Sequence, residues 1–423
     1  MQCTRVRTST RRCSQLLFVC SLSLATAPAN ASETGPLWAP PTDVTWAELV
    51  RLVDAHPRVT ASTARADAAR GGVRAAGAAP NPTFETRIAH GSPPAGGDGK
   101  VEWGLTLNLP LGWLAQRGAR VAAAEAGVEM ADAEARALRR DVLLQLQTLF
   151  WNLAFEQARV KTLEELERQT RVLVSTVRRK VETGEVRPVE GTRVEIELAK
   201  VTAEVESART LLTSRQSQLG LWLGRPRVAA LADLAALPAA ALTEASLPKL
   251  RETHPAIAAA RARVRGLQAE LATEERARIP SFSLIGFTSF ELDRNSYGGG
   301  LAIDLPLWNW NSGRIAQARA ALAAGRKEAD AAALEIESSA IEAQAACRAS
   351  AASASRLGTA VVPRAESAAA IMEKTYNLGE AGLLDIIDAR RTLLDARRLH
   401  LGALAQAQID CSRLAALTGE DSR

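Results

Sequence analysis

Few side chains of this sequence have the type and spacing needed for catalysis or for tight metal binding. The four histidines, His56, His90, His254 and His400, are scattered, and two of them precede prolines, as turn residues often do. The sequence has no nucleophile–base pair, phosphate-binding loop or metal-ligand spacing. We therefore predict that the protein is not an enzyme and has no cofactor and no resident metal.

Asp385 and Asp388 are the acidic residues with the most informative spacing. They lie three residues apart in "GEAGLLDIIDA" and share one face of an expected helix. Acidic residues in a first turn stabilise the N-terminus of a helix. Carboxylates gathered into a ring can instead select cations in a pore. Both roles suit the pair, and the choice between them depends on the elements that hold it.

Two cysteines, Cys347 and Cys411, remain once the leader is set aside, and both fall in alanine-rich stretches that we expect to be helical. They could form one disulfide in an oxidising compartment. Because no CxxC or histidine-rich motif accompanies them, we expect two buried free thiols instead.

The first 31 residues have the layout of a secretory signal peptide, with four arginines, an apolar run and the small-x-small sequence Ala29-Asn30-Ala31. Bulky residues before Cys20 argue against a lipid anchor there. After cleavage at Ala31, 48 basic residues would face 47 acidic ones. A near-neutral chain without a basic face excludes nucleic-acid binding. No later apolar run is long enough for a transmembrane helix.

The chain is a tandem duplication with a period of about 195 residues. The recurring features are His56-Pro57 as His254-Pro255, Pro82-Thr83-Phe84 as Pro280-Ser281-Phe282, Pro110 as Pro306, Gly184-Glu185 as Gly379-Glu380, and Leu219…Gly224 as Leu414…Gly419. Their separations drift only from 198 to 195 residues, whereas chance matches would scatter. We expect one repeat at 32–224, a linker at 225–248 and a second repeat at 249–423.

Each repeat contains two strand-like segments, at 82–109 and at 280–305. In "VEWGLTLNL", the apolar residues Val101, Trp103 and Leu105 alternate with polar ones. This period is typical of strands in a membrane, with the apolar side outward. An edge of a soluble sheet has the same period, so the pattern alone leaves both alternatives open.

The helix-compatible segments match in length within each repeat. Leu114–Thr183 would span roughly 105 Å, and Pro188–Leu223 with Trp46–Ala78, stacked end to end, roughly the same. The second repeat offers Ser312–Asn377 opposite Leu383–Thr418 and Lys249–Arg278. Apolar residues with coiled-coil spacing are Val194, Leu198, Val201, Val205, Ala208 and Leu212, and on the longer helix Val142, Leu146, Leu149 and Leu153. The agreement predicts a helical cylinder.

Prolines flank both strand pairs, at Pro82, Pro110, Pro280 and Pro306. Proline cannot donate to a sheet and is tolerated in the first turn of a helix, so these positions suit a change from strand to helix. Four strands cannot close a barrel, and open edges cannot face lipid. If the strands lie in a membrane, the protein must therefore form an oligomer.

With these features, the sequence from about Trp46 to Gly419 resembles the TolC family of outer-membrane efflux proteins. The resemblance rests on the duplication, the strand–proline–helix transitions and two glycine-containing helix tips. The phrases "PNPTFE", "LPLWNWNSGRIAQARAALAAGRKEA" and "TGEVRPVEGTRVEIELAKV" are most similar to the CzcC-like, heavy-metal branch.

The resemblance implies a mainly α protein with membrane β-strands, in which a homotrimer completes a 12-stranded β-barrel above a long α-barrel. It implies an outer-membrane location in a Gram-negative bacterium, with the helices in the periplasm. The implied partners are outer-membrane lipid, a periplasmic membrane-fusion adaptor and an inner-membrane pump of the RND class. An equatorial region would comprise 225–248 and Ser32–Val44.

The resemblance also assigns residues. Asp385, Asp388, Tyr376 and Glu190 match a periplasmic gate. The basic residue that the family places two after the tip glycine is Ala381 here, and Arg187 or Arg390 could replace it. The tips that would contact the adaptor comprise Gly184, Glu185 and Val186 in the first repeat and Gly379, Glu380 and Gly382 in the second.

The sequence therefore predicts a passive exit duct of a three-part efflux system, with divalent heavy-metal cations as candidate solutes. The alternative is a soluble periplasmic coiled-coil adaptor. An adaptor typically has one helical hairpin between β domains, whereas this chain has two hairpins in tandem.

Overall fold

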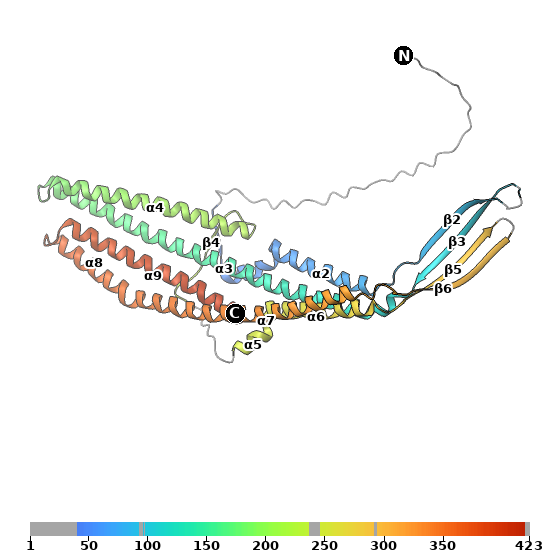
Figure 1. Ribbon diagram of the computed structural model, residues 1–423. Coiled ribbons are helices and arrows are strands. Elements are labelled where there is room, and N and C mark those ends of the chain that lie inside the picture. The colour runs from blue at the N-terminus through green and yellow to red at the C-terminus, as the bar shows by residue number, and fades with distance from the viewer. Residues whose placement is uncertain (1–39, 93–95, 97, 237–245, 292–293, 419–423) are drawn as a thin grey trace, which may run out of the picture.

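The computed structural model describes residues 40–92, 96, 98–236, 246–291 and 294–418. The expected signal peptide lies outside the described residues. The protein is elongated, with a sheet at one end and the tips of two helical hairpins at the other (Figure 1).

The elements follow the same order in both halves. The helices are α1 (Trp46–Leu52), α2 (Pro57–Gly77), α3 (Trp113–Glu182), α4 (Pro188–Trp222), α5 (Ser246–Thr253), α6 (Pro255–Arg276), α7 (Ser312–Arg356), α8 (Val362–Asn377) and α9 (Leu383–Thr418). Two short helical segments are η1 (Val53–Ala55), a 3₁₀ turn, and η2 (Leu357–Val361), a π-helical turn. The strands are β1 (Thr42–Val44), β2 (Thr83–Gly91), β3 (Lys100–Pro110), β4 (Val228–Ala230), β5 (Ser281–Glu291) and β6 (Arg294–Asp304).

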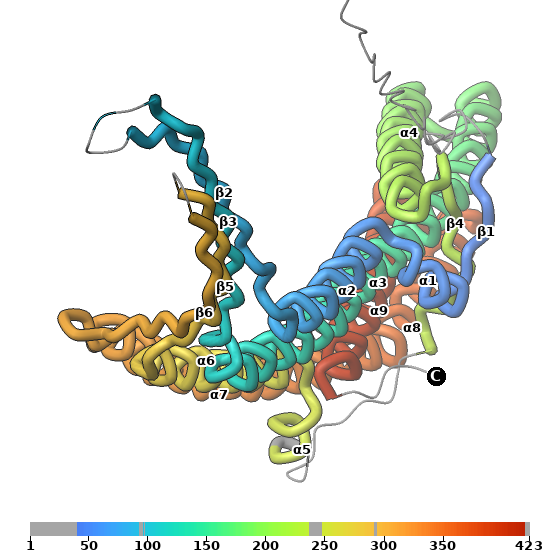
Figure 2. Tube along the Cα trace, turned by 90° about the vertical axis from the view of Figure 1, so that its right-hand side faces the viewer, coloured from blue at the N-terminus to red at the C-terminus, as the bar shows by residue number. Residues whose placement is uncertain are grey.

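The helices form a curved wall (Figure 2). The 70-residue α3 is its spine, because α2 and α6 pack against it near the sheet and α4 and α9 pack against it near the tips. In the second half, α7 packs on α6 and α9, and α8 packs on α9. The segment lengths predicted that shorter helices stack end to end beside a long one, and this prediction is confirmed.

The second long helix differs from the expectation of one unbroken helix over 312–377. It is interrupted by η2 immediately before Pro363, which lies in the first turn of α8. Proline has no N–H to donate to the carbonyl four residues earlier, and a π turn absorbs the missing bond without ending the helical path. The first repeat lacks this proline, and its long helix is uninterrupted.

The two histidine–proline sequences act as helix caps. Each histidine ring accepts a hydrogen bond through Nδ1 from the backbone N–H two residues later, at 3.2 Å for His56 and 3.3 Å for His254. The expected helices at 46–78 and 249–278 are therefore each broken in two at this point. Both histidines therefore lie at turns between helices, as expected from the sequence.

The cap at His254 should make stability depend on pH. Burial, with a smaller contribution from Arg140, lowers the pKa of His254 from 6.5 to about 4. Between pH 6.5 and 4 the unfolded chain binds a proton that the folded chain does not, so stability falls as the pH falls through this window. His254→Asn keeps a capping acceptor but has no group that titrates in this window. We expect the melting temperature of this variant to fall less than that of the wild type when the pH is lowered from 7.5 to 4.5.

The measurement is thermal unfolding of the purified protein at both pH values. His56→Asn is the matched control from the other repeat. The pKa of His56 is also lowered by burial, but its ring is more exposed. If the melting temperature falls equally in the wild type and in His254→Asn, the pH dependence of stability does not come from His254.

The larger sheet is antiparallel with strand order β2-β3-β5-β6. Its register gathers apolar residues on one face, including Phe84, Ile88, Trp103, Leu107, Leu284, Leu301 and Ile303. These side chains are exposed, Ile88 by 79% and Phe84 by 65%. The opposite face carries mainly polar residues, including Glu85, Arg87, Glu102, Thr106, Ser283 and Ser289, and Ile285 and Phe287 of β5 also lie on it. The expected alternation is confirmed, and its apolar face is left uncovered by the protomer.

The largest core cluster lies midway along the wall, where α3 meets α1, α9 and a small sheet. In that sheet, β1 pairs in parallel with β4, so a segment before the first helix is joined to the linker between the repeats. Phe150, Leu146 and Leu153 of α3 are fully buried there beside Leu49 of α1. Burial of large side chains from several elements fixes the wall at its middle, far from both the sheet and the tips.

The expectation of two free thiols is wrong. Cys347 of α7 and Cys411 of α9 form a disulfide, with their Cα atoms 4.6 Å apart. Both residues are buried and pack beside Ala343 and Leu414. Sequence spacing could not reveal the pairing. The two cysteines are 64 residues apart, and whether they face each other depends on how α7 packs against α9.

Candidate functional site

The two hairpin tips are built alike. At each tip a glycine adopts a left-handed conformation, Gly184 with φ 78° and Gly379 with φ 81°. In the first tip, Gly184 N–H donates to Val181 O and Glu185 N–H to Lys180 O. In the second, Gly379 N–H and Glu380 N–H make the equivalent pair of bonds. This C-terminal cap requires the backbone freedom of glycine, so replacement by other residues would strain both tips.

Most residues of the two tips are exposed. Gly184, Glu185, Gly379 and Glu380 are exposed, whereas Val186 and Ala381 are partly buried. The tip residues named from the sequence therefore lie at the extreme end of the molecule, away from the sheet (Figure 1).

Tyr376 anchors the second hairpin against the first. It is 4% exposed and packs with Leu173 and Val177 of α3 and with Val194 of α4. The ammonium of Lys180 lies 4.9 Å from the centre of its ring. Its hydroxyl is buried and has no hydrogen-bond partner among the described residues. A buried hydroxyl without an acceptor is costly, so this contact is stabilised by the apolar packing of the ring and by the ammonium of Lys180.

Glu190 lies close enough to Tyr376 to act on it electrostatically. Burial, and then the negative charge of Glu190, raise the pKa of Tyr376 above its ordinary value. The carboxylate itself lies near Arg193, at 3.5 Å, and Arg187, at 3.6 Å. The structure thus brings Tyr376 and Glu190 together, while Arg187 pairs with Glu190 inside the first hairpin.

Asp385 and Asp388 lie on exposed positions of the first turns of α9. Asp385 Oδ2 accepts a hydrogen bond from Gly382 N–H at 2.9 Å, so this carboxylate caps the helix. Neither aspartate contacts Tyr376 or Glu190 through a bond or ion pair in the described part of the chain. The four residues named from the sequence therefore form two groups, one buried between the hairpins and one exposed on α9.

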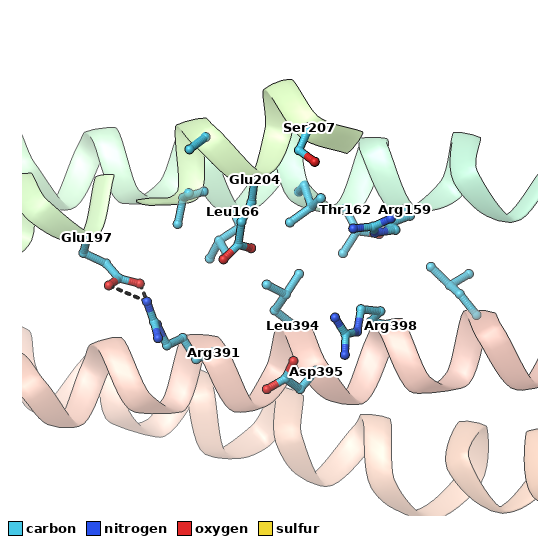
Figure 3. A pocket seen from close by; sticks show the side chains of 14 residues that line it. Arg159, Thr162, Leu166, Glu197, Glu204, Ser207, Arg391, Leu394, Asp395 and Arg398 are labelled. Carbon is cyan, nitrogen blue, oxygen red and sulfur yellow. Dashed lines mark hydrogen bonds and ion pairs between the residues drawn. The ribbon is translucent and has the colours of Figure 1, made fainter. Parts of the chain in front are cut away.

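The strongest polar link between the hairpins was not predicted. Arg391 of α9 donates two hydrogen bonds to Glu197 of α4, each of 2.7 Å (Figure 3). Glu197 is nine-tenths buried. Next to it, Arg390 donates to Gln169 O of α3 at 3.1 Å and to Glu373 of α8 at 2.9 Å. We call these two arginines with their acceptors the arginine clasp.

The only sequence signal for the clasp was a charged residue inside the apolar seam of α4, since Glu197 lies between Val194 and Val201. Its partner could not be named, because Arg391 lies 194 residues away. Of the two arginines suggested as replacements for the missing basic residue, Arg390 does bridge the hairpins, and Arg187 pairs within its own tip.

Beside the clasp a cleft of about 450 Å³ opens between α3, α4 and α9. Glu204 of α4 and Asp395 and Arg398 of α9 are among the residues that line it (Figure 3). These charges are exposed, so water screens them. Within the described residues, no group of three or more histidine, cysteine or acidic side chains could hold a metal ion.

The flanking prolines lie at the sheet boundaries. Pro82 and Pro280 immediately precede β2 and β5, Pro110 ends β3, and Pro306 follows β6 by two residues.

In the described part of the chain, no helix is both long enough and apolar enough to cross a membrane.

Comparisons with known proteins agree on one family. The sequence profile of the outer membrane efflux protein family matches residues 49–225 and 247–420. The cobalt-zinc-cadmium resistance protein CzcC of Cupriavidus metallidurans is 29% identical over 356 residues, which cover 82% of this chain and 83% of that protein.

Solved structures share the fold at low sequence identity. A membrane protein from Pseudomonas aeruginosa superposes with a TM-score of 0.77 at 17% identity, over 88% of this chain and 92% of that one. The outer membrane protein VceC from Vibrio cholerae gives a TM-score of 0.73 at 19% identity, over 88% and 96%.

Proposed function

The chain belongs to the outer membrane efflux protein family, and from that premise we propose that it is the exit duct of a three-part efflux system for divalent metal cations. As a member of this family it is an outer-membrane channel whose helices lie in the periplasm. The observation that carries the proposal is the pairing of an uncovered apolar sheet with a long helical wall in one protomer.

Two observations support divalent metal cations as the solute: the similarity to CzcC and the negative charges near the tips. The name of the CzcC protein refers to resistance to cobalt, zinc and cadmium. In this chain, exposed carboxylates at Asp385 and Asp388 near the tips would favour cations at the mouth of the duct. The duct is passive, and the energy for export would come from a pump in the inner membrane.

A homotrimer is proposed from the sheet edges. The outer edges of β2 and β6 have no partner strand within the described chain. Unpaired edges are not tolerated in lipid, so each edge requires a strand from another copy. Three copies of four strands would give a 12-stranded barrel.

The hairpin tips are proposed to bind a periplasmic adaptor, which would link this duct to the pump. The proposed contacts are the exposed tip residues Gly184, Glu185, Gly379 and Glu380 together with Gly382 and Val186. The proposed gate lies immediately behind the tips and comprises Asp385, Asp388, Tyr376 and Glu190. Tyr376 and the arginine clasp hold the second hairpin against the first there.

The function is tested by deleting the gene and measuring growth with zinc, cobalt, cadmium, nickel, copper and organic drugs. We expect sensitivity to rise for divalent metals and to be restored by the wild-type gene supplied in trans. Increased sensitivity to organic drugs alone would show that the duct serves another class of solute. Unchanged sensitivity to every compound would contradict the proposed role.

Loss of the clasp should open the duct. Arg391→Leu removes the two bonds to Glu197, and an ion pair whose arginine is half-exposed contributes up to about 1 kcal/mol per protomer. We expect a higher single-channel conductance in planar bilayers. Arg168→Leu is the control, since Arg168 pairs with Glu165 inside α3 and links no hairpins. If the two variants have equal conductance, the clasp does not help to keep the duct closed.

A further inference from the structure

The duplication gives the geometry of a contact that one protomer cannot contain. Within the chain, β3 of the first repeat pairs with β5 of the second. In an oligomer, β6 of the second repeat would pair with β2 of the next copy. Because β6 is the repeat of β3 and β2 is the repeat of β5, the observed pairing is a template for the pairing between copies.

The template can be tested inside the chain, since the two hairpins must map onto each other. The separation is 198 residues between β2 and β5 and 196 between β3 and β6. Applied to the first hairpin, these separations carry Thr83↔Asn108 onto Ser281↔Asp304, which is the observed pair in the second hairpin. The repeats therefore agree in register to the residue.

The same separations applied to the β3–β5 register give the contact between copies. In the pair Asn108↔Ile285, Asn108 corresponds to Asp304 and Ile285 to Arg87, so Asp304 would lie opposite Arg87 of the next copy. In the same way, the pair Thr106↔Phe287 places Ala302 opposite Ala89 of the next copy. Leu107↔Gly286 becomes Ile303 opposite Ile88 on the apolar face. We propose that β6 and β2 of adjacent copies pair in this register, with Asp304 facing Arg87; the inference rests on the oligomer of the proposed function.

The chemistry of the edges agrees with this register and not with its neighbours. Slipping by one residue would turn the apolar face of one strand against the polar face of the other, so only slips of two keep both faces. One such slip places Asp304 opposite Glu85, which sets like charges against each other. The other places Asp304 opposite Ala89 and leaves Arg87 opposite Pro306.

Both charges are available for the contact. Arg87 forms no hydrogen bond or ion pair with another described residue, and its side chain is exposed on the polar face. Asp304 is exposed, and it accepts a hydrogen bond from Ser281 Oγ of its own chain on the side that faces β5. The apolar partners are also uncovered, Ile88 by 79% and Ile303 by 46%.

The equivalence ends just beyond the strands. In the first repeat, Gly112 lies so close to Ser281 that an added Cβ would come within 2.6 Å of the serine side chain. The equivalent residue in the second repeat is Trp308, which could not take that place. The loop after β6 must therefore follow another path, and the proposed register extends only to Pro306.

Four cysteine pairs test the register in the full-length protein. Leu111 N–H donates to Phe282 O, so this pair is hydrogen-bonded and Asn108↔Ile285 and Thr106↔Phe287 are not. The derived pairs, Arg87 with Asp304 and Ala89 with Ala302, are therefore of the closer, non-hydrogen-bonded kind that suits a disulfide. The matched controls use the same four positions two residues out of register, Arg87 with Ala302 and Ala89 with Asp304.

Each pair is introduced as a double substitution to cysteine, oxidised in membranes, and separated under denaturing, non-reducing conditions. We expect Ala89→Cys/Ala302→Cys and Arg87→Cys/Asp304→Cys to form covalent oligomers at least several-fold more than the two controls. A control pair that links as well as these two would overturn the register. So would the failure of all four pairs in a protein that is still oligomeric by native mass spectrometry, whereas a monomer would overturn the proposed function as well.

Charge reversal gives an independent readout. Arg87→Asp alone and Asp304→Arg alone should each lower the temperature at which the oligomer dissociates in detergent. The double variant should recover most of the loss, because the attraction is restored with its sign exchanged. A double variant no more stable than the weaker single variant would show that the two side chains do not meet.

Discussion

Asparagine at both Asp385 and Asp388 is expected to remove most of the cation selectivity of the duct. In a trimer the two positions contribute six carboxylates near the tips. Several charges acting across water at about one Debye length together favour a monovalent cation by about 1 kcal/mol, or roughly fivefold. The same charges disfavour chloride by a similar amount, so the permeability ratio of potassium to chloride should fall by roughly 25-fold in bilayer recordings.

Asparagine is chosen so that the fold is retained. Its side-chain oxygen can still accept the hydrogen bond that Asp385 receives from Gly382, so the N-terminus of α9 stays capped. Asp330→Asn on α7, where the carboxylate pairs with Lys327, is the control. Unchanged selectivity in the double variant would leave the aspartates with the capping role alone. Selectivity should also weaken as salt concentration rises, because screening shortens the reach of the charges.

Serine at both Cys347 and Cys411 should give the largest loss of stability. The disulfide closes a loop of 64 residues between α7 and α9. In the chain-entropy description, releasing a loop of this length costs about 4 kcal/mol. We expect a clear drop in the temperature at which the protein unfolds, and hydrogen exchange should rise first in α7 and α9, which the bond holds together.

Reduction provides the control for this prediction. Under a strong thiol reductant the wild type should approach the unfolding temperature of the serine variant, while the variant itself should not change. If wild type and variant unfold at the same temperature under oxidising conditions, the disulfide does not contribute to the native structure.

The alternative of a soluble adaptor is not retained. The family profile matches both repeats, and the strands of the two repeats lie side by side in one sheet at a single end of the molecule. The boundaries proposed from the sequence at residues 31, 224 and 248 remain predictions.

Periodicity in the sequence identified the four strands of the larger sheet and the helical segments in their order, but not the breaks within three of those segments or the small β1–β4 sheet. Alternation in "VEWGLTLNL" identified β3 and its apolar face, and the length of helix-compatible sequence identified α3 almost to the residue. Glycine identified both tips, because a left-handed residue at a helix end is a local requirement. These features depend on neighbours within a few residues, and so does the pattern that reveals them.

The tertiary structure alone decided the contacts between distant segments. The disulfide, the arginine clasp and the burial of Tyr376 against α3 and α4 all join residues whose facing depends on the packing of whole helices. The π turn before Pro363 belongs with them, because a proline predicts a disturbed helix without saying whether the helix ends or bends. Local pattern therefore determined what each segment is, and packing determined what it touches.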